Sequence, residues 1–200
     1  MHADEKETER VQSLRVQFWL QLQGIPAENL IFIDEAGVNL SLIRQFARAP
    51  KGKRAYSKRP QKRSKNVSVI GAIGLKGVIS KYSLLGATDG LTFEAFISQH
   101  LVPQLWEGAY VVMDNCSIHK GKEIENLIEM AGAKLIYLPP YSPDFSPIEN
   151  CWSKIKSILR SIGARNYPSL AQAIEAAFNQ VSLNDIRNWF TQCCYCTSLD

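Results

Sequence analysis

Three acidic residues stand at positions where separate elements of the chain could bring them together. Asp34 follows the apolar run Leu30–Ile33, and Asp114 follows the apolar run Tyr110–Met113. Glu149 falls in the first turn of an expected helix, where the helix dipole favours a carboxylate. Ligands of open α/β sheets bind beyond the carboxyl ends of strands. We therefore expect the two aspartates to lie at one edge of a sheet, with Glu149 facing them.

Carboxylates from separate elements that meet at one point are typical ligands of hard divalent cations such as Mg²⁺. Two such ions about 3.5–4 Å apart activate a nucleophilic water or hydroxyl and stabilise the leaving oxygen of a phosphodiester. Clustered carboxylates repel one another without cations, so their convergence would itself argue for metal. Each acid also has a plainer interpretation: strand-end aspartates are commonly turn residues, and first-turn glutamates commonly complement the helix dipole.

A strongly basic segment follows the first of these acids. Between Arg44 and Lys65 there are ten Lys or Arg residues and no Asp or Glu, whereas the rest of the chain has 13 basic and 19 acidic residues, a net charge of −6. Such a block is typical of a surface that binds a polyanion, because each cation placed at a phosphate releases counterions. The alternative is a solvated loop without a partner. The residues predicted to contact DNA are Lys51, Lys53, Arg54, Lys58, Arg59, Lys62, Arg63 and Lys65.

The composition is that of an ordinary globular chain. Its 200 residues are 46% hydrophobic and 21% charged, which argues against disorder and coiled coil. No apolar run approaches the roughly 18 residues that a membrane span needs, and the polar N-terminus does not resemble a secretion signal, so we expect a cytoplasmic protein without a membrane partner. The sequence contains no Walker P-loop, GxGxxG, GxSxG or HExxH motif, so we expect no organic cofactor.

The five cysteines are expected to be reduced thiols. The C-x-x-C spacing of Cys193 and Cys196, together with Cys116 and His119, leaves a zinc site open as a weak alternative.

The elements that position the acids follow from hydrophobic periodicity and turn residues. An early hairpin followed by alternating strands and helices predicts an α/β fold with a mixed sheet covered by helices. The expected elements are a helix over 7–22, a strand over 30–33 that ends at Asp34, a hairpin within 67–85, a helix over 92–105 with Thr92 as N-cap, a strand over 110–113, a helix over 120–131, a strand over 134–138, a helix over 147–159 with Ser146 as N-cap, and helices over 168–180 and 183–192.

Three stretches of the chain carry a resemblance to a known family. The strings IDEAG at 33–37, VVMDNCSIHK at 111–120 and LPPYSPDFSPIENCWSKIK at 138–156 resemble the catalytic domain of DDE transposases, in particular the bacterial insertion-sequence group related to mariner-type elements. Thirty-four residues separate Asp114 from Glu149, which matches the spacing in that group. The resemblance covers roughly residues 8–160.

The resemblance implies an RNase H-like fold, with a mixed five-stranded sheet whose first three strands are antiparallel and whose later strands are parallel. It implies that Asp34, Asp114 and Glu149 bind two Mg²⁺ or Mn²⁺ ions. The implied activity is phosphodiester hydrolysis at element ends followed by strand transfer into target DNA, commonly at TA dinucleotides. The implied assembly is a homodimer on two DNA ends, in the nucleoid of a bacterial cytoplasm.

We expect several residues near the three acids to support them or to contact DNA. Asn115 and His119 occupy positions that are usual around the family's second acid, and we expect a supporting or packing role for His119. Lys156 lies seven residues after Glu149 on the same helix face and is a candidate contact to a DNA phosphate. Asp144, five residues before Glu149, is the rival third acid. We prefer Glu149 because its helix would point it at the strand ends.

Members of the family carry an N-terminal helix-turn-helix region that recognises element ends. We expect residues 1–26 to be a helix and linker without that region, and residues 27–200 to be the catalytic domain. Two alternatives remain. One is an RNase H-like endonuclease that hydrolyses DNA without joining strands, and the other is a truncated, non-catalytic DNA-binding regulator of a full-length transposase.

Overall fold

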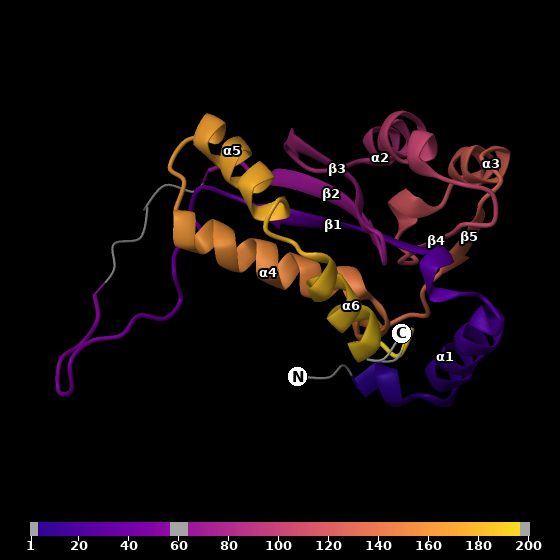
Figure 1. The fold of residues 1–200 in the computed structure, drawn as a ribbon, viewed down its shortest axis with the longest axis horizontal. Helices are drawn as coiled ribbons and strands as arrows, with labels where there is room; N and C mark the ends of the chain where they lie inside the picture. The colour runs from indigo at the N-terminus through magenta and orange to yellow at the C-terminus, as the bar shows by residue number, and fades with distance from the viewer. Residues whose placement is uncertain (1–3, 57–63, 197–200) are drawn as a thin grey trace.

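The computed structural model describes residues 4–56 and 64–196, which are built around a five-stranded sheet (Figure 1). The strand order is β3-β2-β1-β4-β5. The first three strands are antiparallel neighbours, whereas β4 runs parallel to β1 and β5 runs parallel to β4. The predicted mixed sheet is therefore confirmed in strand number and direction. The strands are β1 (Leu30–Val38), β2 (Val67–Gly74), β3 (Gly77–Leu85), β4 (Tyr110–Met113) and β5 (Lys134–Tyr137).

Helices cover both faces of this sheet (Figure 1). One face carries α4 (Pro147–Ile162), α5 (Tyr167–Phe178) and α6 (Leu183–Gln192), and the other carries α2 (Gly90–Phe96) and α3 (Lys122–Met130). The first helix, α1 (Glu9–Leu22), lies beyond the end of the sheet at which β1 begins. Short turns of 3-10 helix occur at Asp4–Glu7, Ala27–Asn29, Val102–Gln104, Ser117–His119 and Pro143–Phe145.

The two faces of β1 belong to two different hydrophobic cores, because successive side chains of a strand point to opposite sides. Leu30 and Phe32 pack in the core with α4, α5 and α6, whereas Ile31 packs in the core with α2 and α3. The same alternation separates two neighbouring acids. Asp34 lies on the face covered by α4, and Glu35 lies on the face covered by α2 and α3.

The first strand is longer than expected. It continues to Val38 instead of ending at Asp34, because the antiparallel ladder with β2 extends from Ile31 to Val38. The parallel ladder with β4 ends earlier, at the pair Phe32 and Val112. Asp34 therefore lies within β1 but beyond its last pair with β4, at the edge of the cleft that its carboxylate lines.

The helix expected over 92–105 also differs in detail. Asp89 is its N-cap, since the Asp89 carboxylate accepts hydrogen bonds from the backbone N and the Oγ1 of Thr92 at 2.8 and 2.6 Å. The prediction of Thr92 as the cap was wrong. Regular α-helix ends at Phe96, and a π-helical turn and a 3-10 turn containing Pro103 follow. Proline has no amide hydrogen to continue the helical ladder, which accounts for the irregular end.

The first part of the basic segment, up to residue 56, follows β1 and extends away from the body of the molecule (Figure 1). We call residues 43–56 the arm. Its base is fastened by a hydrogen bond from Asn39 to Asn66 at 3.1 Å, and by Arg165, whose Nη1 donates to the carbonyl oxygens of Leu40 and Leu42 at 3.1 Å each. Within residues 4–56 and 64–196, no helix is long and apolar enough to cross a membrane.

Candidate active site

All three predicted acids line one cleft of about 460 Å³. Asp34 comes from β1, Asp114 is the first residue after β4, and Glu149 is the third residue of α4. The loop 138–143 forms another wall of the cleft, and Asn115 also lines it. The structure therefore brings together the acids that the sequence analysis selected from three separate elements.

Asp34 is held by Trp152 of α4, whose ring packs against β2. The indole Nε1 of Trp152 donates a hydrogen bond to Oδ2 of Asp34 at 2.9 Å. Gly71, the partner of Asp34 in β2, allows this approach, because a Cβ at that position would lie 2.8 Å from the indole ring. The sequence analysis did not select Trp152 as a site residue. Its spacing of three residues from Glu149 is the signal that puts both side chains toward the same site.

The surroundings of Asp34 disfavour its charged form. Burial raises the pKa of Asp34 to about 7, and the negative charges of Glu149 and Glu35 act in the same direction. Hydrogen bonds from the amide of Glu35 and from the Trp152 indole oppose this shift but do not cancel it. A cation bound beside Asp34 would relieve the same repulsion.

Asp114 is more exposed and is paired through one oxygen. Its Oδ1 accepts a hydrogen bond from the backbone N of Cys116 at 3.0 Å and forms an ion pair with Nδ1 of His119. The contact with His119 is the main reason that the pKa of Asp114 lies below its usual range. No hydrogen bond from the described residues reaches Oδ2. This second oxygen is therefore available to a ligand.

His119 is buried and lies between two carboxylates. Its Nε2 lies 2.9 and 3.0 Å from the two carboxylate oxygens of Glu35, while Nδ1 faces Asp114. Burial alone would lower the pKa of His119, but the two acids outweigh it and raise the pKa to about 10. The sequence analysis expected a supporting or packing role for His119 but did not name Glu35. The available signal was an acid directly after Asp34, on the opposite face of the strand.

The other predicted residues lie at different places. Asn115 is exposed at the cleft, whereas Lys156 is half-buried on α4 and does not line it. Lys51, Lys53 and Arg54 are exposed on the arm, and Lys65 is exposed near its base. The remaining predicted DNA contacts lie outside the described residues: Lys58, Arg59, Lys62 and Arg63.

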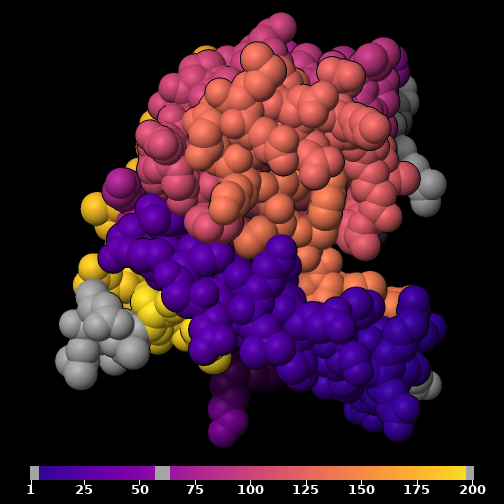
Figure 2. Space-filling model, turned by 90° about the vertical axis from the view of Figure 1, so that its right-hand side faces the viewer, coloured from indigo at the N-terminus to yellow at the C-terminus, as the bar shows by residue number. Residues whose placement is uncertain are grey.

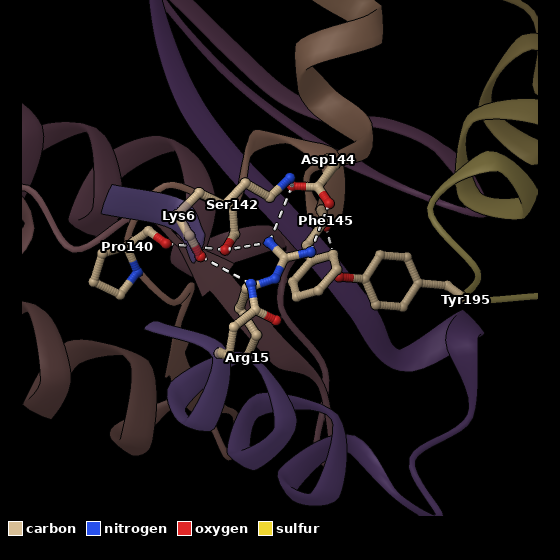
Figure 3. A network of polar contacts seen from close by, with 8 residues as sticks. Lys6, Arg15, Pro140, Ser142, Asp144, Phe145 and Tyr195 are labelled. Atoms are coloured by element: carbon tan, nitrogen blue, oxygen red, sulfur yellow. Dashed lines mark hydrogen bonds and ion pairs between the residues drawn. The ribbon is translucent and has the colours of Figure 1, made fainter. Parts of the chain in front are cut away.

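Asp144 has a different environment from the acids in the cleft (Figure 3). Arg15 of α1 donates to both of its carboxylate oxygens, at 3.1 and 2.7 Å, and Lys6 forms an ion pair with it at 3.2 Å. The hydrogen bonds from Arg15 are the main reason that the pKa of Asp144 falls to about 2. Asp144 is not among the residues that line the cleft. We call the contacts of Arg15 and Lys6 with Asp144 the clip.

Arg15 also holds the loop that forms a wall of the cleft. Arg15 donates to Oγ of Ser142 at 2.7 Å, and Ser142 donates to the carbonyl oxygen of Pro140 at 3.0 Å (Figure 3). On the other side of this loop, the hydroxyl of Tyr195 donates to the carbonyl oxygen of Phe145 at 2.6 Å. Figure 2 shows the indigo N-terminal segment directly against the orange part of the chain. Both ends of the described chain therefore contribute to fixing the loop.

The donor set fits a hard divalent cation. The salt bridges among the described residues include no lysine or arginine paired with Asp34, Asp114 or Glu149. Over the same residues, no three His, Cys, Asp or Glu side chains lie close enough to hold one metal ion together, and this holds for the three acids of the cleft as well as for the residues of the zinc alternative. Mg²⁺ usually binds through one or two carboxylates and keeps several waters, so an open cleft of carboxylates suits it better than a closed cage.

Comparison with known proteins identifies the family and the fold of this chain. Residues 29–172 match the family described as DDE superfamily endonuclease. No curated protein matches the sequence. The fold is similar to a Mos1 transposase paired-end complex with left transposon end, with a TM-score of 0.76 and 13% identity over 96% of this chain and 60% of that chain.

Two further solved structures show the same likeness. A Mos1 mariner paired-end complex with Mn has a TM-score of 0.74 and 13% identity over 98% of this chain and 61% of that chain. The catalytic domain of Mos1 mariner transposase has a TM-score of 0.66 and 13% identity over 96% of this chain and 90% of that chain. This chain spans about 60% of the transposase chains in the two complexes. It belongs to the DDE superfamily endonucleases and has their RNase H-like fold.

Proposed function

We propose that this chain is the catalytic domain of a DDE transposase. It would cut phosphodiester bonds at the ends of a DNA element and join the freed 3′-hydroxyl to target DNA. The observation that carries this proposal is the convergence of Asp34, Asp114 and Glu149 on one cleft, where none of them is neutralised by a lysine or arginine of the described residues. The family match and the likeness to Mos1 transposase support the same activity.

The three carboxylates would hold two Mg²⁺ or Mn²⁺ ions, which supply activation of the attacking oxygen and stabilisation of the leaving one when bound. Asp34 would contribute its carboxylate, which the Trp152 indole orients through a hydrogen bond to Oδ2. Asp114 offers Oδ2, because its Oδ1 is already engaged by Cys116 and His119. Glu149 completes the donor set from the first turn of α4. The similar Mos1 structures include a complex with Mn.

The arm is the proposed DNA-binding element outside the cleft. Its cations Lys51, Lys53 and Arg54 are exposed, and two large aromatic side chains, Phe46 and Tyr56, are 89% and 88% exposed. Cations bind the phosphate backbone, and exposed rings offer stacking surfaces to bases. We propose that two copies of the chain act on two DNA ends, with TA dinucleotides as targets. The similar Mos1 complexes contain paired ends.

The proposed catalytic domain covers residues 27–200, and residues 1–26 lead into it. The structure adds an observation to this division. Phe18 and Leu22 of α1 pack in the same hydrophobic core as β1 and α4, and Arg15 holds the cleft wall. The leading segment is therefore part of the structural unit that carries the site.

The test is a cleavage and joining assay with Mn²⁺. The wild-type chain should nick plasmid DNA and should join a pre-cleaved DNA end to a second DNA, and Asp114→Asn should abolish both activities while thermal unfolding shows a folded protein. Nicking that persists undiminished in Asp114→Asn would overturn the site. Hydrolysis without joining would favour the endonuclease, the activity that the family description names. DNA binding without nicking would favour the non-catalytic regulator.

A further inference from the structure

Glu35 and His119 form a buried ion pair, and neither residue is one of the proposed metal ligands. His119 is 1% exposed, and the Glu35 side chain is 15% exposed. A buried ion pair contributes little net stability compared with well-packed apolar residues of similar volume. Its contribution to folding is therefore a poor explanation for its presence, and its location beside Asp114 suggests another one.

The backbone leaves Asp114 weakly fixed. The ladder between β1 and β4 ends at Phe32 and Val112, so Asp114 follows the last residue of a strand with no further pairing to β1. Its side chain is 53% exposed. An exposed carboxylate at a strand end samples several rotamers unless another group holds it. Apart from the Cys116 amide, the group that holds Oδ1 of Asp114 is the imidazole of His119.

The imidazole of His119 is itself held from several sides. The backbone N of His119 donates to the carbonyl oxygen of Cys116 at 3.1 Å, and the Tyr137 hydroxyl donates to the carbonyl oxygen of His119 at 3.1 Å. The ring of Phe93 lies 4.3 Å from the imidazole ring, centroid to centroid. Glu35 then receives Nε2 through both carboxylate oxygens. Side chains from β1, α2 and β5 therefore fix the position of the His119 ring.

We propose that Glu35 and His119 are positioning residues for Asp114. Glu35 holds the imidazole of His119, and the imidazole holds Oδ1 of Asp114, so that Oδ2 is directed to the cleft. This inference rests on the proposed function, because it assigns Asp114 a metal to bind. Residues that stand behind metal ligands typically contribute about 10- to 100-fold to metal affinity or activity.

Two amides at position 119 can separate positioning from packing. The side-chain nitrogen of asparagine can take the place of Nδ1 and reach Asp114, whereas the longer glutamine side chain places its amide near Nε2 and reaches Glu35 instead. The side chain of His119→Gln should therefore no longer hold Asp114, and that of His119→Asn should still do so. Glu35→Gln is combined with His119→Asn, so that no buried carboxylate is left without a partner.

The main measurement is Mn²⁺ affinity of the full chain without DNA, read from the electron paramagnetic resonance signal of free Mn²⁺. We expect Glu35→Gln and His119→Gln to weaken Mn²⁺ binding about 10- to 100-fold. The Glu35→Gln/His119→Asn double variant should bind Mn²⁺ more tightly than His119→Gln. Nicking should lose kcat in the same order, with little change in KM for DNA. Glu175→Gln is the matched control, because Glu175 of α5 is ion-paired with Lys81 of β3 and does not line the cleft, so the variant should leave all values unchanged.

The outcomes separate this inference from the proposed function. Asp114→Asn that weakens Mn²⁺ binding, together with Glu35→Gln and His119→Gln that stay within twofold of wild type, would overturn positioning and leave the active site standing. Unchanged Mn²⁺ binding in Asp114→Asn would overturn the proposed function itself. Where a variant is less stable, Mn²⁺ affinity is measured at a temperature at which unfolding curves show it folded. Equal affinities for His119→Gln and the double variant would then indicate packing alone and overturn the inference.

Discussion

Asp144 and Glu149 lie five residues apart in one segment, yet the fold treats the two carboxylates in opposite ways. Asp144 is bound by Arg15 and Lys6 in the clip, outside the cleft. Glu149 faces the cleft, and the salt bridges of the described residues include none to it. Both carboxylate oxygens of Asp144 accept hydrogen bonds from the Arg15 guanidinium, so neither is free for a cation, whereas no salt bridge of the described residues occupies Glu149. The difference teaches that tertiary pairing, more than position in the sequence, decides which acid can bind metal.

The same distinction separates the cations of the molecule. Arg15 and Lys6 are committed to Asp144, and their role is structural. Lys51, Lys53 and Arg54 on the arm are exposed and have no salt bridge among the described residues. Within this part of the chain, the charges without a salt bridge include Asp34 and Glu149 at the cleft and these three cations on the arm. A metal-dependent enzyme that acts on DNA needs both.

The largest expected difference between the two acids is in catalysis. Glu149→Gln removes one ligand charge from the cleft and should lower Mn²⁺-dependent nicking by at least about 100-fold, since even residues behind a ligand contribute about 10- to 100-fold. Asp144→Asn should keep nicking within a few-fold of wild type. Initial nicking rates at saturating Mn²⁺, measured for both variants in one preparation series, make the comparison. A larger loss in Asp144→Asn than in Glu149→Gln would reverse our assignment of the third acid.

The arm provides the next largest effect. Replacing Lys51, Lys53 and Arg54 together by Gln removes three unpaired cations, so DNA affinity should fall for all sequences alike. The slope of log Kd against log salt should become shallower by up to about 0.9 for each phosphate that the variant no longer neutralises. Fluorescence anisotropy with labelled duplex DNA over a range of salt concentrations gives the slope. Replacing the paired Lys81 by Gln serves as the control and should leave it unchanged. An unaltered slope in the triple variant would make the arm a solvated surface.

Burying Asp34 without a cationic partner among the described residues should make the free energy of unfolding depend on pH. Its pKa is raised from 3.8 to about 7 by burial first, so between these values the folded state keeps a proton that the unfolded state has lost. Stability therefore falls as pH rises from about 4 to 7, and the full cost remains above pH 7.

Asp34→Asn removes this cost, and its amide oxygen can still accept the hydrogen bond from Trp152. In metal-free buffer at pH 8, the variant should have a Tm at least about 4 °C above that of wild type, since 1 kcal/mol corresponds to about 2–4 °C in a chain of this size. At pH 4 the two should coincide. Thermal unfolding by circular dichroism at both pH values is the measurement, and an equal Tm at pH 8 would contradict the raised pKa.

The sheet could be predicted from the sequence, but the pairing of charges could not. The strands are short apolar runs separated by turn residues, and these local patterns were sufficient for their positions along the chain, whereas the strand directions were predicted from the family resemblance. The extension of β1 past Asp34 depends on pairing with β2, which a run of apolar residues does not reveal. Likewise, Arg15 reaches Asp144 across 129 residues, and Glu35 reaches His119 across 84. Such contacts depend on how helices and loops pack on the sheet. The sequence favoured Glu149 over Asp144 from its helix position, but the pairing of Asp144 with Arg15 is visible only in the structure.

The smallest effect concerns the stability of the clip. Asp144→Asn should lower the free energy of unfolding by about 1 kcal/mol at pH 7, because partly exposed ion pairs contribute up to about 1 kcal/mol and the bidentate geometry places this pair at the upper end of that range. The pKa of Asp144 is lowered from 3.8 to about 2, mainly by Arg15. The contribution is therefore complete above about pH 4 and is lost as pH falls through 2. Urea unfolding curves should show the wild-type advantage at pH 7 and little of it at pH 2.

A double-mutant cycle with Arg15→Gln assigns this effect to the clip. If the pair is the cause, Asp144→Asn should change stability much less when Arg15 is already replaced, and the coupling should approach the single-variant effect. Arg15 also packs over the ring of Phe145 at 3.8 Å and donates to Ser142, so Arg15→Gln alone should cost more than Asp144→Asn. Equal, additive losses would mean that the two side chains act separately. The contrast between the paired and the unpaired acid would then rest on catalysis alone.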